Sequence, residues 1–226
     1  MSEKLQEQGD TEPGAAIYSR WLLAIYDLWV LGFVNSFIWR CSTKRTLLPF
    51  FRKNVRKHHL DIGVGTGYYL KHANIPADVN VTLADLNANT LVAAKEQLGR
   101  PDAETWLHDI TKPLPTKDKF DSISMFYLLH CMPPPTSSKT AIFSHLKFNM
   151  ASDGVLYGAT ILGEGVKHNL MGKALKAMLN RKGVFGNTHD TEAEFVDALK
   201  ENFNIVHSQV VGAILLFKAE EPKLKV

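Results

Sequence analysis

From about Lys57 onward, short β-rich runs alternate with helical stretches, and this alternation constrains the fold more than any other feature. Five runs have the composition of strands, at 58–62, 79–85, 105–108, 120–128 and 154–162. Alternation of this kind is typical of a mostly parallel sheet flanked by helices. The fourth run is almost wholly apolar, as expected of a strand that is covered on both faces.

The carboxyl end of the sequence predicts how the sheet is completed. Thr191 and Glu194 form a capping box at the start of a helix, and two strand-like runs at 204–211 and 213–218 follow it. Too little chain separates these runs for a helical crossover, so they must be antiparallel neighbours. The sequence therefore predicts an α/β sheet with one antiparallel strand.

A glycine-rich loop, DIGVGTG at 61–67, directly follows the first predicted strand. Ligands bind outside the carboxyl ends of such strands, and glycine lets them approach the backbone closely. The third glycine of a dinucleotide fingerprint is replaced by Tyr68 or Leu70, and there is no triphosphate-binding loop. Asp61 would repel a pyrophosphate but complements an ammonium or sulfonium group. The loop therefore predicts a cationic nucleoside without phosphates.

Two further acids end the next two predicted strands. Asp85 lies eighteen positions after Gly67, where a carboxylate can accept both hydroxyls of a ribose. Asp109 closes the third strand, where its carboxyl can accept the exocyclic amine of a base. A single acid at a strand end is more often a solvated turn residue. Three such acids together with the glycine loop predict a cofactor site.

These motifs resemble those of class I S-adenosylmethionine-dependent methyltransferases. The resemblance runs from about Tyr18 to the end of the chain, and it rests on DIGVGTG at 61–67, LADLN at 83–87, HDI at 108–110 and KFDSISMFYLLHCMP at 119–133. It implies a Rossmann-like α/β fold with a seven-stranded, mostly parallel sheet, the last strand antiparallel, and N-terminal covering helices. It also implies S-adenosylmethionine as the cofactor.

The resemblance assigns cofactor-binding positions residue by residue. They are Tyr18, Asp61, Gly63, Gly65, Gly67, Asp85, Leu86, Asn87, His108, Asp109, Ile110 and Phe126. The glycines would line the methionine end and Asp61 would face its amino group. Asp85 would hold the ribose, and Asp109 with Ile110 the adenine. Val64 and Thr66 depart from the cysteine, serine or alanine that is frequent there.

The amino-terminal part resembles a small-molecule subgroup from microbial natural-product pathways, in which a helix with Tyr-Ser and Tyr-Asp pairs covers the cofactor. The matching pairs here are Tyr18-Ser19 and Tyr26-Asp27. We expect a flexible tail over 1–14, a helical cap over 15–56 and a methyltransferase domain over 57–226, which together form one domain.

The segment 21–39 has the length and apolarity of a membrane-spanning helix. Asp27 near its middle would cost about 3 kcal/mol on insertion. We therefore expect a buried or cleft-covering helix, with association at a membrane surface as the alternative. The polar first fourteen residues do not resemble a secretory signal, and the two cysteines are far apart, which favours a cytoplasmic protein.

His130 is the candidate general base, beside Tyr127, if the acceptor must lose a proton. Its alternative role is that of a structural hydrogen-bonding group. The aromatic residues Tyr18, Trp21, Tyr26 and Trp29 either line the acceptor site or pack in the core. The insertion at 163–190 is either a lid over the acceptor or a plain amphipathic core helix.

The sequence therefore predicts methyl transfer to oxygen or nitrogen of a small, mostly apolar acceptor in secondary metabolism. Two alternatives are a cofactor-assisted cyclisation or dehydration without methyl transfer, and a non-catalytic binding subunit. The 26 basic and 23 acidic residues give no case for a nucleic-acid partner. No histidine or carboxylate spacing suggests a metal site. We expect a monomer or a homodimer.

Overall fold

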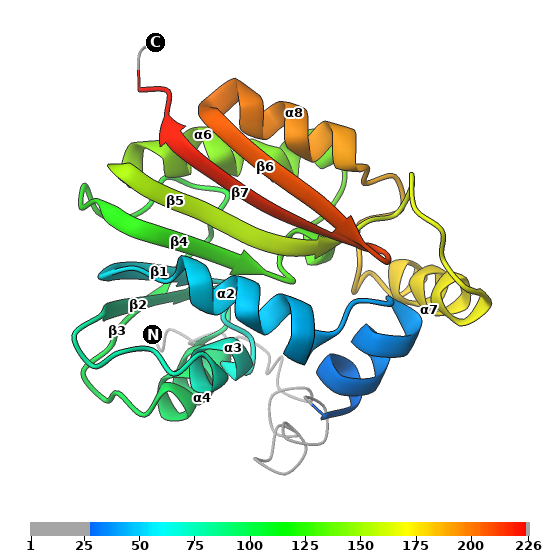
Figure 1. Cartoon of the computed structure of the whole chain (residues 1–226), viewed down its shortest axis with the longest axis horizontal. Coiled ribbons are helices and arrows are strands. Elements are labelled where there is room, and N and C mark those ends of the chain that lie inside the picture. The colour runs from blue at the N-terminus through cyan, green and yellow to red at the C-terminus, as the bar shows by residue number, and fades with distance from the viewer. Residues whose placement is uncertain (1–27, 225–226) are drawn as a thin grey trace, which may run out of the picture.

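Seven strands form one sheet in the computed structural model, which describes residues 28–224 (Figure 1). The strands are β1 (His58–Ile62), β2 (Asn80–Asp85), β3 (Glu104–Leu107), β4 (Phe120–Phe126), β5 (Met150–Ile161), β6 (Phe203–Val211) and β7 (Ile214–Pro222). Their order is β3-β2-β1-β4-β5-β7-β6. The pairs among β1 to β5 are parallel, and β7 is antiparallel to both of its neighbours. This confirms the predicted fold class.

Helices cover both faces of the sheet (Figure 1). One layer contains α2 (Leu48–Asn54), α3 (Tyr68–His72) and α4 (Ala88–Leu98), and the other contains α5 (Thr136–Thr140), α6 (Ile142–Leu146) and α8 (Glu192–Asn202). A seventh helix, α7 (Leu170–Arg181), lies at one end of the sheet beside the π-helix η2 (Leu28–Ile38). Shorter elements are the π-helix η3 (Thr43–Leu47) and the 3₁₀ turns η4 (Leu129–Cys131) and η5 (Lys147–Asn149).

Alternation along the strands builds two separate cores. On β5, Val155 and Tyr157 face the α2–α3–α4 layer, whereas Leu156 faces the α5–α6–α8 layer, because successive side chains of a strand point to opposite faces. On β1, Leu60 and Ile62 belong to the second core. Their neighbours in the strand are polar, so the first core contains buried hydrogen-bonding groups.

Local sequence signals fix several element ends. Asn87 caps α4 by accepting a hydrogen bond from the Asn89 amide, and Gly99 ends the helix in the left-handed region, with φ of 70°. The capping box of Thr191 and Glu194 starts α8. These predictions are confirmed.

Two strand boundaries differ from the prediction by four residues, whereas the others agree within one or two. β5 begins at Met150 rather than 154, because a shift in register against β4 accommodates an exposed polar stretch at 152–153. β7 extends to Pro222, and Glu220 near its end forms an ion pair with Arg56 at 3.0 Å. Both extensions contain polar residues, so the apolar pattern in the sequence did not predict them.

The amino-terminal cap is described in part. The helix expected within 21–39 is a π-helix over Leu28–Ile38, and it ends where the Trp39 amide donates to the Val34 carbonyl at 3.0 Å. Within residues 28–224, no helix is both long and apolar enough to cross a membrane. The predictions for the tail over 1–14, and for Tyr18, Trp21 and Tyr26, lie outside the described residues.

Candidate active site

The glycine loop leaves β1 at the centre of the sheet. Gly63, Gly65 and Gly67 all have positive φ, at 71°, 52° and 75°. A Cβ on Gly67 would lie 2.7 Å from the Ala94 Cα, so glycine lets the loop pack against α4. A Cβ on Gly65 would have no atom within 4 Å. The loop therefore has open space beside its middle glycine.

Asp61 lies directly beneath this loop, in β1, and is only 5% exposed. The Ser124 hydroxyl of β4 donates a hydrogen bond to its Oδ1 atom. Burial raises the pKa of Asp61 to about 7, while the Ser124 hydrogen bond lowers it and the Asp85 charge raises it. Within residues 28–224, no lysine, arginine or histidine forms an ion pair with Asp61. This buried carboxylate is therefore suited to a cation from outside the described chain.

Asp85 ends β2, the strand next to β1, as predicted. Its Oδ1 atom accepts a hydrogen bond from the Asn87 amide at 2.9 Å, which fixes the turn into α4. Leu86 between them is 70% exposed. An exposed leucine next to a half-buried carboxylate offers one apolar and one polar contact to a ligand at this edge.

Residues 108–110 follow β3, one strand further along the edge. Asp109 accepts hydrogen bonds from the Thr111 amide and hydroxyl at 3.0 and 2.7 Å, and these bonds hold its pKa below the usual value. Ile110 is buried. The His108 amide donates to the Asp85 carbonyl at 3.0 Å. The structure thus brings the three predicted acids to the carboxyl ends of three adjacent parallel strands.

Phe126 is the last residue of β4, on the other side of β1. Its ring is buried among aromatic rings of the first core: Phe50, Phe51, Tyr69 and Tyr157. Tyr127 follows with a positive φ of 61°, and its amide donates to the Ala159 carbonyl of β5 at 2.8 Å. The chain therefore turns sharply at the point where strand order reverses between β1 and β4, which is the usual ligand position in open α/β sheets.

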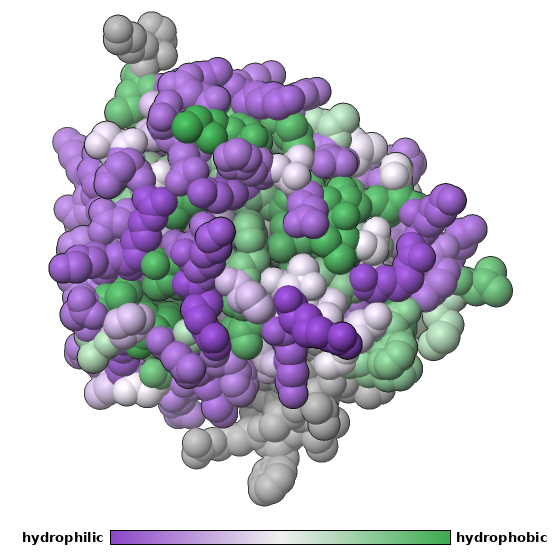
Figure 2. All heavy atoms as spheres, viewed as in Figure 1, coloured by the Kyte–Doolittle hydropathy of each residue, from purple (hydrophilic) through white to green (hydrophobic). Residues whose placement is uncertain are grey.

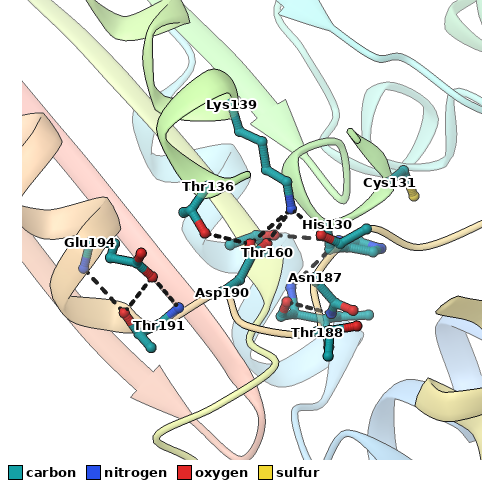
Figure 3. A network of polar contacts seen from close by, with 12 residues as sticks. His130, Cys131, Thr136, Lys139, Thr160, Asn187, Thr188, Asp190, Thr191 and Glu194 are labelled. Carbon is teal, nitrogen blue, oxygen red and sulfur yellow. Dashed lines mark hydrogen bonds and ion pairs between the residues drawn. The ribbon is translucent and has the colours of Figure 1, made fainter. Parts of the chain in front are cut away.

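His130 lies in η4 and is 2% exposed. Its Nδ1 atom is 3.5 Å from the Ile161 amide nitrogen and 3.4 Å from the Thr160 hydroxyl (Figure 3). Its ring lies against Phe185. Burial, together with the nearby Lys139 charge, lowers the pKa of His130 to about 3. The imidazole is therefore neutral near pH 7 and a weak base, which favours the hydrogen-bonding role over that of a general base.

Next to His130 lies a buried ion pair that the sequence did not reveal. The Lys139 Nζ atom of α5 contacts both carboxylate oxygens of Asp190, at 2.9 and 2.6 Å, and donates to the Gly186 carbonyl at 2.7 Å (Figure 3). Thr136 donates to Asp190 at 3.0 Å. Both charged side chains are at most 2% exposed. A single lysine in a Ser/Thr-rich run gives no signal of a partner 51 residues away.

A hollow of about 800 Å³ lies at the carboxyl end of β5. It is lined by Gly163, Glu164, Gly165, Val166, Lys167, His168, Lys173 and Lys176. Asn169, the N-cap of α7, donates to the Phe37 carbonyl at 2.9 Å and so links α7 to η2. Leu170 and Met171 are 83% and 59% exposed, and Figure 2 shows apolar surface next to hydrophilic side chains around α7. The helix α7 therefore exposes apolar side chains at its start, while Leu175 packs against the first core.

A mostly parallel sheet with this strand order and an antiparallel β7 is the fold of class I S-adenosylmethionine-dependent methyltransferases. The glycine loop after β1, and the acids after β1, β2 and β3, lie at its ligand-binding edge. In the part of the chain that the structure describes, no group of three or more histidine, cysteine or carboxylate residues is arranged to hold a metal ion.

The chain belongs to the methyltransferase domain family, whose model matches residues 39–208. It is 48% identical to the physcion biosynthesis cluster O-methyltransferase of Aspergillus chevalieri, over 95% of this chain and 97% of that protein. It is 45% identical to the N-methyltransferase vrtF of Penicillium aethiopicum, over 99% and 93%. The N-methyltransferase NodS of Bradyrhizobium japonicum WM9, solved with S-adenosyl-L-homocysteine, aligns with a TM-score of 0.57 at 15% identity, over 78% and 85%. The protein is therefore a methyltransferase.

Proposed function

We propose that the protein transfers a methyl group from S-adenosylmethionine to oxygen or nitrogen of a small, mostly apolar acceptor in secondary metabolism. The observation that carries this proposal is Asp61, a buried carboxylate without a cationic partner in the described chain, beneath a loop with open space at Gly65. A cofactor that presents an ammonium group fits this site, whereas a phosphate would be repelled. The names of the relatives, an O- and an N-methyltransferase, support both acceptor atoms.

In this proposal, Asp61 contacts the cofactor's ammonium group, and Gly63, Gly65 and Gly67 line its methionine end. Asp85 accepts the ribose hydroxyls, with Leu86 and Asn87 beside it. His108, Asp109 and Ile110 border the adenine, Phe126 lies on the opposite side, and Tyr18 contacts the cofactor from the cap. The cofactor supplies an electrophilic methyl group on sulfur. The exposed Leu86 and the acids at adjacent strand ends support this arrangement.

The protein's own contribution to the reaction is alignment and exclusion of water. We propose that Tyr127 and His130 shape the acceptor side of the site. The positive φ of Tyr127 and the packing of its ring against His130, with centroids 5.4 Å apart, support this role. An acceptor that needs a base would have to lose its proton to solvent or to another group, since the pKa of His130 is about 3.

We further propose that the cap over 15–56 covers the cofactor as part of one domain with residues 57–226, and that the acceptor enters between this cap and the hollow at β5. The link between Asn169 and Phe37 supports this route, because it joins the cap to α7. A small molecule is the expected partner. A location in the cytoplasm fits the sparse, unpaired cysteines, and we propose that the protein is a monomer or a homodimer.

Incubation of the purified protein with S-adenosylmethionine and extract of the producing cell tests the proposal. Mass spectrometry is expected to find S-adenosylhomocysteine together with a product that is one methyl group heavier. Converted substrate with intact cofactor would instead indicate the cyclisation or dehydration alternative. The Asp61→Asn variant tests the proposed cofactor site in the same assay, and it should lose most of the turnover. An Asp61→Asn variant with full activity would contradict the proposed cofactor site.

A further inference from the structure

A continuous row of polar groups runs through the first core, from the start of β1 to Asp61. The Arg56 amide lies 2.9 Å from the Ser122 hydroxyl, which lies 2.9 Å from Nδ1 of His59. Nε2 of His59 lies 3.2 Å from the Ser124 hydroxyl, which contacts Asp61 Oδ1. The side chains of this row alternate between β1 and β4, whose residues His59 and Ser122 are paired in register.

The donors and acceptors in this row can be assigned by elimination. An ionised Asp61 can only accept, so Ser124 must donate its single hydroxyl hydrogen to it. Ser124 can then only accept from His59, which places the imidazole hydrogen on Nε2. Burial lowers the pKa of His59 to about 3, although a backbone hydrogen bond with Ser122 acts to raise it, so the ring is neutral. With its one hydrogen on Nε2, the neutral ring has none on Nδ1. Nδ1 accepts from Ser122, and Ser122 accepts from the Arg56 amide, which can only donate.

Every donor in the row therefore points toward Asp61. Hydrogen bonds that share one direction polarise each other, and they gain strength in a core from which water is excluded. His59, Ser122 and Ser124 are fully buried. The rings of Phe51 and Tyr157 lie 5.7 and 6.2 Å from the His59 ring and enclose it.

We propose that His59 and Ser124 are positioning residues that hold Asp61 oriented, and supplied with a donated hydrogen bond, for the ammonium group of the cofactor. This inference rests on the proposed function, because it assumes that Asp61 meets this group. The row fixes one carboxylate oxygen from below and leaves the other to the ligand. The Ser124 hydroxyl at the end of the row donates a hydrogen bond that water would donate to an exposed carboxylate.

The other titratable groups near Asp61 do not replace this row. The charge of Asp85 on β2 raises the pKa of Asp61. The charge of Asp61 in turn raises the pKa of Tyr157 on β5. Burial and the Asp85 charge both disfavour the ionised form of Asp61, whereas the Ser124 hydrogen bond favours it.

Calorimetry with two ligands separates positioning from general damage to the fold. S-adenosylhomocysteine carries the ammonium group, whereas 5′-methylthioadenosine lacks it. We expect Ser124→Ala to weaken S-adenosylhomocysteine about tenfold and 5′-methylthioadenosine less than about twofold. Thr82→Val, which removes a buried hydroxyl on β2 outside the row, is the matched control and should change neither affinity. Equal weakening of both ligands by Ser124→Ala would overturn the inference.

A second measurement tests the row without any ligand. In protein labelled with ¹⁵N-histidine, two-bond ¹⁵N–¹H spectra at pH 8 should show His59 as a neutral ring with its hydrogen on Nε2. A hydrogen on Nδ1 would overturn the assignment. If Asp61→Asn binds S-adenosylhomocysteine as well as the wild type does, the proposed role of Asp61 fails, and the spectrum still decides the direction of the row.

Discussion

Two buried aspartates, Asp61 and Asp190, lie at the same edge of the sheet in opposite electrostatic situations. Burial raises the pKa of both carboxyl groups. Asp190 receives two contacts from the Lys139 ammonium and one from Thr136, so its charge is compensated within the fold. Asp61 receives one hydroxyl hydrogen bond from Ser124 and has no ion-pair partner in the described chain.

The difference separates an acid whose charge is paired within the fold from an acid that we propose meets a ligand. A buried charge costs several kcal/mol unless it is paired. At Asp190 the chain supplies the pairing cation, and the result is a fixed connection between α5 and the segment before α8. At Asp61 the Ser124 hydrogen bond offsets only part of this cost, since the pKa of the carboxyl stays raised, at about 7. A buried carboxylate that is only partly compensated is a physical signature of a binding site.

Loss of the internal cation should have the largest effect. Lys139→Met leaves Asp190 buried without a partner, and we expect it to lower the free energy of unfolding by about 3–5 kcal/mol. Urea denaturation measures this change. Lys117→Met, at an exposed lysine, is the control and should stay within about 0.5 kcal/mol of the wild type. A loss below about 1 kcal/mol in Lys139→Met would refute the structural role of the pair.

Loss of the charge at Asp61 should raise the free energy of unfolding, whereas loss of the Lys139 charge lowers it. The pKa of this carboxyl is about 7 in the folded protein and near 3.8 in the unfolded chain. The folded state therefore binds more protons between these values, and stability of the ligand-free protein decreases as pH rises from about 4 to 7. Asp61→Asn removes this loss, and we expect a gain of up to about 4 kcal/mol at pH 8.

The gain should be smaller at pH 5.5 than at pH 8, which urea denaturation at the two pH values can check. A variant that is less stable than the wild type at pH 8 would show that Asp61 is compensated within the protein, as Asp190 is.

Cofactor affinity should depend on pH through the same group. The ammonium of S-adenosylhomocysteine favours the ionised form of Asp61, so binding below pH 7 requires release of a proton. We expect the affinity to fall toward tenfold for each pH unit below about 7. Calorimetry in buffers of different ionisation enthalpy would detect the released proton at pH 6. The Asp61→Asn variant should bind weakly and without this dependence.

The smallest effect is expected at His130. Because its pKa is about 3, this ring does not titrate between pH 5 and 8. His130→Gln should leave the shape of the kcat/KM profile unchanged over this range and lower its height by less than about 100-fold, the lower limit typical of a lost general base. Disappearance of an inflection near pH 6–7 in the variant would restore His130 as the base.

The positions of the glycine loop and of the three acids could be predicted from sequence because their signals are local. The loop at 61–67, the cap at Asn87 and the acids at 85 and 109 each lie within a few residues of a strand end, and strand ends meet at one edge. The capping box at Thr191 is similarly local. Short-range patterns of this kind need no knowledge of the tertiary fold.

The polar pairs that cross between elements could not be predicted. His59 and Ser124 are 65 residues apart in the chain, and Lys139 and Asp190 are 51 apart. Their meeting depends on strand register and helix docking, which composition does not encode. The burial of His130 was hidden for the same reason, since the Phe185 ring that packs against it comes from a distant segment of the chain.

The insertion at 163–190 begins and ends at the same point, next to the carboxyl end of β5. The amides of Gly163 and Glu164 both donate to the Asp190 carbonyl, at 2.9 and 3.1 Å, so the two ends of this segment are joined directly to each other. The part nearest Asp190 is also fixed to the fold, because Asn187 donates to the Ile161 carbonyl of β5 and the Gly186 carbonyl accepts from Lys139. Variation is therefore best tolerated among the exposed residues of α7, such as Leu170 and Met171, where an exchanged side chain leaves both anchor points and the strands in place.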